Sequence, residues 1–148
     1  MTKAKNFSLE TGEGTKTLSD YAGAALVLYF YPKDMTSGCT TQAQGFRDKK
    51  AEFDAAGAQI LGVSKDTLKS HEKFASKEGL NFLLGSDAQG HVCEDYGVWK
   101  EKSMYGKKYM GIERSTFLID SAGNLVREWR KVKVPGHVDE VLEAVKSL

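Results

Sequence analysis

A run of apolar and aromatic residues leads through a polar loop to a cysteine in the segment Leu26-Val27-Leu28-Tyr29-Phe30-Tyr31-Pro32-Lys33-Asp34-Met35-Thr36-Ser37-Gly38-Cys39-Thr40. Residues Leu26–Tyr31 carry no charge, which is typical of a strand covered on both faces of a sheet. Residues Thr40–Ala55 mix apolar and charged positions as an amphipathic helix does, and Gly57 supplies its stop. The segment therefore predicts a buried strand, a loop, and a helix that begins at the cysteine.

The remaining elements alternate in the same way on both sides of this segment. The turn residues Ser121–Asn124 are expected to join two strands into a hairpin. The last helix is expected to bury one apolar stripe, formed by Val138, Val141, Leu142, Val145 and Leu148. The order predicts an α/β protein with a thioredoxin-like fold, in which helices flank a central mixed β-sheet. The other predicted elements are strands Gln59–Ser64, Ser115–Asp120 and Leu125–Lys131, helix Thr67–Glu78 ending at Gly79, a short helix capped by Ser86 or Asp87 and running through Tyr96, and helix His137–Leu148.

Length and composition exclude several classes of protein. The 148 residues suit one domain over positions 1–148, with no repeat or linker to divide them. Lys plus Arg is 21 and Asp plus Glu is 20, a formal charge of +1, so the basic excess of a nucleic-acid binder is absent. No apolar run approaches the roughly 20 residues that cross a membrane, and the start of the sequence, from Met1 to Phe7, lacks the apolar stretch of a signal peptide. We therefore expect a cytoplasmic monomer without nucleic-acid or membrane partners.

The chain has two cysteines, Cys39 and Cys93, which lie 54 positions apart. Two cysteines are too few for a disulfide-rich scaffold, and this spacing is unlike that of a zinc knuckle. The three histidines, His71, His91 and His137, show no ligand spacing in the sequence. We therefore expect no metal, and solvated or packing roles for the histidines.

Cys39 has the surroundings of a reactive thiol. The positive end of a helix dipole favours the thiolate, which is the nucleophilic form of cysteine. Thr36 precedes the cysteine by three residues, so its hydroxyl can lie beside the sulfur and hold an oxygen substrate. Pro32 can shield the pocket from water and removes one N–H from the loop. A lone cysteine is more often a small buried apolar residue, so the spacing alone leaves both interpretations open.

The pattern Pro32-x-x-x-Thr36-x-x-Cys39 resembles the peroxidatic motif of peroxiredoxins. The wider similarity, from about Phe7 to the last helix, is to the bacterioferritin comigratory protein branch, also called peroxiredoxin Q. It is carried by Phe46-Arg47-Asp48, Leu61-Gly62-Val63-Ser64, Ser70-His71, Phe74, Tyr96-Gly97-Val98-Trp99, Gly106-Lys107-Lys108-Tyr109 and Gly111-Ile112-Glu113-Arg114-Ser115-Thr116-Phe117-Leu118-Ile119-Asp120.

This resemblance implies a thioredoxin-dependent peroxidase that reduces hydrogen peroxide and organic hydroperoxides. Cys39 would be the peroxidatic cysteine and would pass through a sulfenic acid. Arg114 matches the family's active-site arginine, which would stabilise the thiolate and the peroxide oxygens. Thr36 would bind the peroxide and Pro32 would shield the pocket. Trp99, Tyr105 and Tyr109 are expected to pack around the pocket or at its rim. No metal or organic cofactor is implied, because sulfur is the redox centre.

Three positions depart from the family pattern. Many members of the branch have a resolving cysteine five residues after the peroxidatic one, where this chain has Gln44. Gln42 replaces a frequent carboxylate, and it can hydrogen-bond Arg114 without neutralising it. We expect a more electropositive pocket that favours the Cys39 thiolate. Ser37 replaces a usual proline, which leaves a free N–H in the loop.

Two questions stay open at the level of the sequence. Either Cys93 resolves the sulfenic acid or an external thiol does, and Cys93 could reach Cys39 only after local unfolding if the two lie far apart. The peroxidase hypothesis also has an alternative, a non-enzymatic thioredoxin-fold peroxide sensor or binding module. The function of such a module would not require Cys39, Thr36 and Arg114 to occur together.

Overall fold

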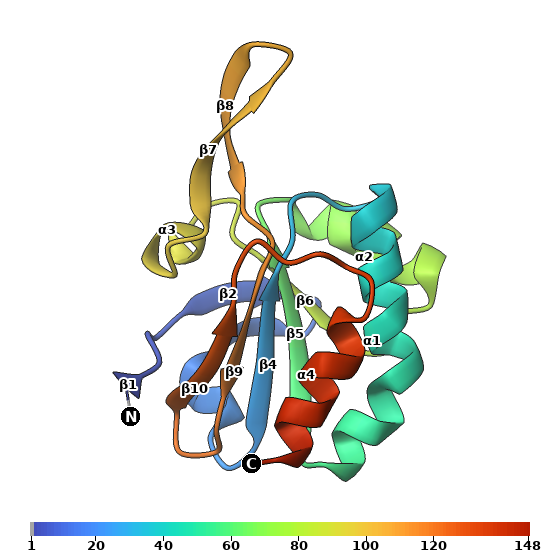
Figure 1. Ribbon diagram of the computed structural model, residues 1–148, viewed down its shortest axis with the longest axis vertical. Coiled ribbons are helices and arrows are strands. Elements are labelled where there is room, and N and C mark those ends of the chain that lie inside the picture. Colours follow the sequence, from blue (N-terminus) through green and yellow to red (C-terminus); the bar gives the residue numbers. More distant parts are fainter. Residues whose placement is uncertain (1) are drawn as a thin grey trace.

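The computed structural model describes residues 2–148, and its main feature is a mixed sheet with helices against both faces (Figure 1). In chain order the elements are β1 (Thr2–Lys3), β2 (Ser8–Thr11), β3 (Gly14–Thr17), the 3₁₀ turn η1 (Leu18–Tyr21), β4 (Ala25–Phe30), α1 (Ser37–Ala55), β5 (Ala58–Ser64), α2 (Leu68–Glu78), β6 (Leu83–Ser86), α3 (Val92–Asp95), β7 (Trp99–Met104), β8 (Lys107–Ile112), β9 (Ser115–Ile119), β10 (Asn124–Trp129) and α4 (His137–Lys146).

The strands of the main sheet follow the order β1-β10-β9-β4-β5-β6-β2-β3. Strands β4, β5 and β6 run parallel, and β9 pairs antiparallel with β4. Every residue of β4 is buried, as its unbroken apolar sequence predicts for a central strand. The expected mixed sheet flanked by helices is therefore confirmed, with a carboxyl end of β4 that leads directly into the Cys39 loop.

Side chains of β4 alternate between two separate hydrophobic cores. Val27 and Tyr29 pack into the core that α1, α2 and α4 cover. Leu28 and Phe30 pack into the core on the other face, together with Val92 of α3. Figure 1 shows α1 and α4 on one side of the sheet and α3 on the other. The period-two alternation of a strand thus divides the molecule into two halves that share no core residue.

Two glycines allow unusually close packing in the first core. A Cβ atom at Gly45 would lie 2.9 Å from Cγ2 of Val138, so the glycine lets α1 and α4 approach closely. A Cβ atom at Gly62 would lie 2.8 Å from Cζ of Tyr29, so the tyrosine ring lies directly over β5. Any larger residue at either position would have to displace a buried side chain.

The predicted helices are present, with changes at their ends. Helix α1 begins at Ser37 rather than Thr40, which puts Cys39 inside its first turn. Helix α2 ends at Gly79 as predicted, in a left-handed conformation with φ of 60°. The short helix predicted through Tyr96 covers only Val92–Asp95. The prediction that Leu148 lies on the buried stripe of α4 is wrong, because α4 ends at Lys146 and Leu148 is 54% exposed.

The hairpin β7–β8 was not predicted from the sequence, nor were β1, β2, β3 and β6. The two residues that connect β7 to β8, Tyr105 and Gly106, have φ of 52° and 77°, as a type I′ turn requires. A tyrosine in the left-handed conformation is uncommon, and it hides this turn from a search for Asn-Gly or Asp-Gly. Figure 1 shows the hairpin projecting away from the main sheet. In the described residues, helices that combine the length and the apolarity needed to cross a membrane are absent.

Candidate active site

Cys39 lies in the first turn of α1 with a side chain that is 2% exposed. The first backbone hydrogen bond at this end runs from the Thr40 N–H to the Thr36 carbonyl, at 2.9 Å. The N–H groups of residues 37–39 therefore precede the helical ladder and carry the positive end of the helix dipole. This is the environment in which a thiol forms a nucleophilic thiolate.

Arg114 lies between β8 and β9 and joins Cys39 to Gln42. Its Nη2 donates to Sγ of Cys39 at 3.3 Å, and its Nη1 donates to Oε1 of Gln42 at 2.6 Å. The expected Gln42–Arg114 hydrogen bond is therefore confirmed. A Cβ atom at Gly38 would lie 3.2 Å from Nη2, so the glycine leaves room for the guanidinium beside the cysteine. The fold thus joins two residues that are 75 positions apart in the chain.

Thr36 and Pro32 border the same loop. Thr36 is the N-cap residue of α1, and its exposed hydroxyl donates to the Lys33 carbonyl at 2.8 Å. Among residues 2–148 this hydroxyl makes no hydrogen bond to Cys39, and the lone pairs of its oxygen stay available. Pro32 follows β4 directly and is half-buried. Both residues therefore stand where the motif predicts, on the loop that delivers Cys39.

A buried polar network holds this loop to the rest of the molecule. The Asp34 carboxylate accepts from the Tyr31 hydroxyl at 2.5 Å, from Ser70 Oγ at 2.8 Å and from His71 Nδ1 at 2.7 Å. The Asp34 N–H donates to Asp66 at 2.8 Å. Burial alone would raise the pKa of Asp34, but the hydrogen bonds from His71 and Tyr31 outweigh it and lower the pKa. The loop is thereby tied to α2 and to the end of β5.

Three members of this network have the spacing of a metal-ligand set. Oxygen atoms of Asp34 and Asp66 and a ring nitrogen of His71 lie within 4.8 Å of one another. No motif or spacing in the sequence indicates this cluster, because its members come from three segments. The same carboxylates already accept several hydrogen bonds, and His71 Nε2 lies 3.0 Å from the Gly85 carbonyl. These bonds give the cluster a structural use as a polar anchor.

Cys93 lies in the other half of the molecule. It is fully buried in the core that contains Phe30 and Phe117, whereas Cys39 belongs to the core under α1. The backbone N–H of Cys93 donates to Oδ2 of Asp87 at 2.8 Å. Burial and then the charge of Asp87 raise the pKa of the Cys93 thiol. A basic neighbour that the sequence did not reveal, Lys65, pairs with Asp87 at 3.2 Å but only partly offsets this rise.

The aromatic residues expected near the pocket have separate positions. The ring of Trp99 lies under Lys65 Nζ, at 5.2 Å from the ring centroid. Tyr105 is 98% exposed at the tip of the β7–β8 hairpin, so the prediction that it packs around the pocket is wrong. Tyr109 lies on β8 and is also exposed. Of the three, only Trp99 is half-buried.

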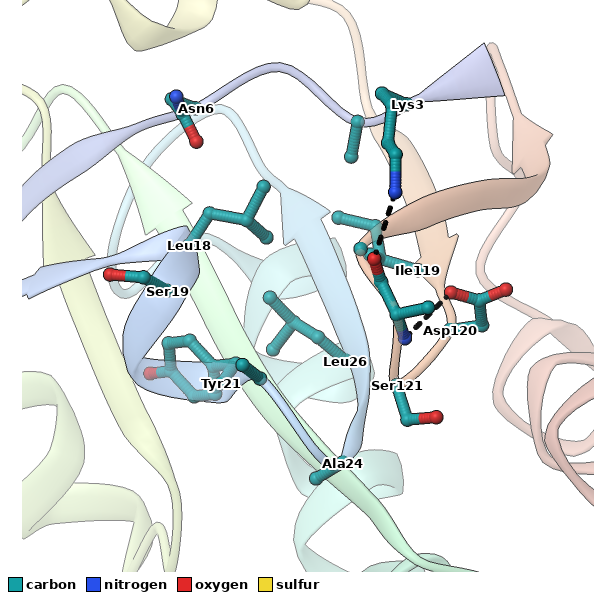
Figure 2. A pocket seen from close by; sticks show the side chains of 14 residues that line it. Lys3, Asn6, Leu18, Ser19, Tyr21, Ala24, Leu26, Ile119, Asp120 and Ser121 are labelled. Atoms are coloured by element: carbon teal, nitrogen blue, oxygen red, sulfur yellow. Dashed lines mark hydrogen bonds between the residues drawn. The ribbon is translucent and has the colours of Figure 1, made fainter. Parts of the chain in front are cut away.

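A pocket of about 500 Å³ lies at the opposite end of β4 from Cys39 (Figure 2). Figure 2 shows Tyr21, Leu26 and Ile119 among its lining side chains, and Lys3 Nζ donating to the Ala122 carbonyl at 3.3 Å. The described residues that line it include neither cysteine nor histidine. A second groove, of about 580 Å³, runs along α1 from Gly38 to the segment before α4. The described lining of this groove also includes neither cysteine nor histidine.

Comparison with known proteins shows the family of the chain. The AhpC/TSA family matches residues 1–128. The chain belongs to the AhpC/TSA family. Peroxiredoxin Bcp of Bacillus subtilis is 52% identical over 147 residues, which cover 99% of this chain and 94% of the relative. Peroxiredoxin Bcp of Escherichia coli is 46% identical over 145 residues, covering 97% of this chain and 93% of that protein.

Solved structures show the same architecture. A structure of Xanthomonas campestris peroxiredoxin Q has a TM-score of 0.90 at 52% identity and covers 95% of this chain and 90% of that chain. A second Xanthomonas campestris structure, described for the alkyl peroxide reduction activity of bacterioferritin comigratory protein, has a TM-score of 0.90 at 51% identity, with the same coverage. The predicted thioredoxin-like fold and the resemblance to the peroxiredoxin Q branch are confirmed. This AhpC/TSA member is therefore a peroxiredoxin, a thiol-dependent peroxidase.

Proposed function

We propose that Cys39 is the nucleophile of this peroxidase and that its substrates are hydrogen peroxide and organic hydroperoxides. The observation that carries the proposal is the contact between Arg114 Nη2 and Cys39 Sγ, at 3.3 Å, in the first turn of α1. A guanidinium and a helix N-terminus both stabilise a thiolate, and here they act on the same sulfur. The enzyme needs no metal or organic cofactor for this chemistry.

In the first step, the Cys39 thiolate attacks the terminal oxygen of the hydroperoxide. A sulfur–oxygen bond forms as the oxygen–oxygen bond breaks, so that sulfur is oxidised to a sulfenic acid and the peroxide is reduced. The leaving alkoxide takes a proton and departs as an alcohol, or as water when the substrate is hydrogen peroxide. The N–H groups of Arg114 donate to the oxygen on which negative charge develops.

Thr36 and Pro32 would complete the pocket. The hydrogen of the Thr36 hydroxyl is donated to the Lys33 carbonyl at 2.8 Å, so Oγ1 would accept the hydrogen bond from the hydroperoxide O–H. Gln42 Nε2 has no acceptor among residues 2–148, although it is buried beside Arg114, and an oxygen-bearing substrate would supply one. Pro32 would limit access of water to the sulfur.

In the second step, an external dithiol such as thioredoxin would reduce the sulfenic acid. A reductant thiolate attacks the Cys39 sulfur as the sulfur–oxygen bond breaks; the hydroxide that leaves takes a proton to become water, and a mixed disulfide remains. The second reductant thiol then attacks the reductant's own sulfur in this disulfide, so that Cys39 is released and the reductant is oxidised to a disulfide. Burial of Cys93 in the other core favours this route over resolution by Cys93. Two free thiols suit a reducing compartment such as the cytoplasm, where we propose that the protein acts as a monomer.

The test is consumption of hydrogen peroxide with dithiothreitol as the reductant. The wild-type protein should turn over, and Cys39→Ser should reduce consumption to the rate in buffer, because a serine hydroxyl cannot undergo the sulfur redox step. Cys93→Ala is the matched control, since it removes the other buried thiol, and it should retain turnover. Unchanged consumption by Cys39→Ser would refute the proposal.

A further inference from the structure

The two faces of the β7–β8 hairpin carry different side chains. The six pairs of its antiparallel register run from Trp99 opposite Ile112 to Met104 opposite Lys107. Because residues directly opposite each other share a face, the register assigns every hairpin residue to one side. We call one side the cationic face, and it consists of Lys100, Lys102, Met104, Lys107, Tyr109 and Gly111. The opposite face consists of Trp99, Glu101, Ser103, Lys108, Met110 and Ile112.

The two faces of the hairpin differ in charge. The cationic face has three lysines and no carboxylate, whereas on the opposite face Lys108 pairs with Glu101 at 3.5 Å. The cationic face also exposes two apolar side chains, Met104 at 57% and Tyr109 at 44%. Exposed apolar groups beside unpaired charge of one sign are typical of a surface that binds a partner.

The cationic face leads to the catalytic centre. Its middle lysine, Lys102, packs its stem across Gly111, where a Cβ atom would lie 3.2 Å from Cδ of Lys102. Burial of this stem and then the nearby charge of Arg114 lower the pKa of Lys102, whereas Cys39 and Glu113 partly offset this shift. Arg114 itself follows β8 by two residues. The Arg114 end of the hairpin is therefore its end near Cys39, and the face extends from there along the hairpin, which Figure 1 shows projecting from the main sheet.

We propose that the cationic face is the docking surface for the protein that reduces Cys39, a dithiol protein with carboxylates and apolar groups around its own nucleophilic cysteine. This inference rests on the proposed function. Lys100 and Lys107 are opposite ends of the face, separated by four residue steps along each strand, or about 14 Å. A small thiol or hydroperoxide cannot contact both ends at once, whereas a protein surface can. Complementary charge would speed the encounter and orient the partner's cysteine toward Cys39.

Lys107 and Lys108 provide a matched pair of variants. They are adjacent, both exposed, and on opposite faces of the hairpin. Lys107→Glu and Lys108→Glu change the net charge of the protein by the same amount. They differ in the face that they alter and in the exposed pair with Glu101, which Lys108→Glu removes. The probe is a thioredoxin of net negative charge, kept reduced by its reductase and NADPH, with hydrogen peroxide as the oxidant.

With this thioredoxin at low ionic strength, Lys107→Glu should raise the KM for thioredoxin about fivefold to tenfold, and Lys108→Glu less than about twofold. The difference should disappear at about 0.5 M KCl, because salt screens exposed charges. With dithiothreitol both variants should turn over like the wild type, which shows that they fold and that Cys39 works.

Three results would overturn the docking surface while leaving the proposed function intact. They are equal effects of the two variants with thioredoxin, failure of thioredoxin to reduce a wild-type protein that dithiothreitol does reduce, and a wild-type dimer in sedimentation that Lys107→Glu alone dissociates. The last result would make the face a contact between two copies of the chain. Absence of wild-type turnover with dithiothreitol would instead refute the proposed function, and the docking surface with it.

Discussion

Arg114 uses two different N–H groups on two different partners, Sγ of Cys39 and Oε1 of Gln42. The planar guanidinium holds both groups in a fixed geometry, whereas a lysine ammonium is a point charge on a flexible stem. Because the Gln42 contact orients the guanidinium, a positive charge alone cannot replace the guanidinium. The arginine is therefore expected to act through its shape as well as its charge.

Replacement of Arg114 by lysine tests this argument. Arg114→Lys keeps the charge but cannot contact Cys39 and Gln42 at the same time, so kcat/KM for hydrogen peroxide should fall about 100-fold to 1000-fold. Stopped-flow oxidation by peroxide measures this constant directly. Arg127→Lys is the control, because Arg127 forms an exposed pair with Glu140 at 3.0 Å and should leave the constant unchanged. A loss of less than threefold in Arg114→Lys would show that charge alone is sufficient.

Single residues of the site differ in how far the sequence predicts them. Cys39, Thr36 and Pro32 share one short motif, so their joint position on a loop follows from the chain itself. Arg114 needs the resemblance, because nothing in its own neighbourhood points to a residue 75 positions earlier. Asp34 was missed altogether. Its partners Ser70 and His71 lie 36 and 37 positions away, and only the parallel pairing of β4 with β5 brings them together.

At the scale of elements, His137 connects α4 to the central sheet. It is the first residue of α4, and its Nε2 lies 2.8 Å from the Thr116 hydroxyl on β9. The ring is buried and also packs edge-on against Trp129, at 5.7 Å between centroids. Burial lowers the pKa of His137 to about 4; the charge of Glu140 opposes this shift, and the charges of Arg114 and Arg127 add to it. The neutral imidazole is therefore part of the contact between helix and sheet.

This contact makes the stability of the fold depend on pH. The unfolded chain binds a proton at His137 below about 6.5, whereas the folded protein resists protonation down to about 4. Stability is thus complete above pH 6.5 and is lost as the pH falls toward 4. From this group we expect a loss of about 1–2 kcal/mol in the free energy of unfolding between pH 7 and pH 5.

Urea unfolding at pH 7 and pH 5 measures this loss in the wild type and in His137→Gln. Glutamine can keep a hydrogen bond to Thr116 but does not titrate, so the variant should be less sensitive to pH by that amount. An equal loss in both proteins would assign the pH dependence to other groups.

Elements were predicted well where one strong pattern sets them. Strand β4 follows from an unbroken apolar run, and the end of helix α2 follows from Gly79. The edge strands β1 and β3 are short and have no fully buried residue, so they lack an apolar pattern to detect. Strand β2 does alternate exposed and buried residues, but over only four positions, and one of its two buried residues is a threonine. Strands β7 and β8 have many exposed residues, and their hairpin is specified by the Tyr105-Gly106 turn and by cross-strand pairing rather than by burial.

At the scale of the whole molecule, the central sheet separates the two thiols. Cys39 packs with the side chains of β4 that face α1, and Cys93 packs with those that face α3. A disulfide requires Cα atoms within about 7 Å. The two sulfurs could therefore join only if one of the helices that carry them, α1 or α3, left its core. The 54 positions between the cysteines did not reveal this, because sequence separation says nothing about which face of a strand a residue contacts.

The number of free thiols after oxidation tests this separation. After one equivalent of hydrogen peroxide, dimedone added to the folded protein should trap the sulfenic acid at Cys39, and after unfolding one thiol, Cys93, should remain for iodoacetamide to alkylate. Cys93→Ala should turn over with dithiothreitol like the wild type, although the cavity at this buried site should cost about 1–2 kcal/mol of stability.

Oxidised wild type without any alkylatable thiol, and with a mass two hydrogens lower, would instead identify a Cys39–Cys93 disulfide. Helix α3 would then have to leave its core during every catalytic cycle, and Cys93→Ala would accumulate the sulfenic acid that the wild type does not.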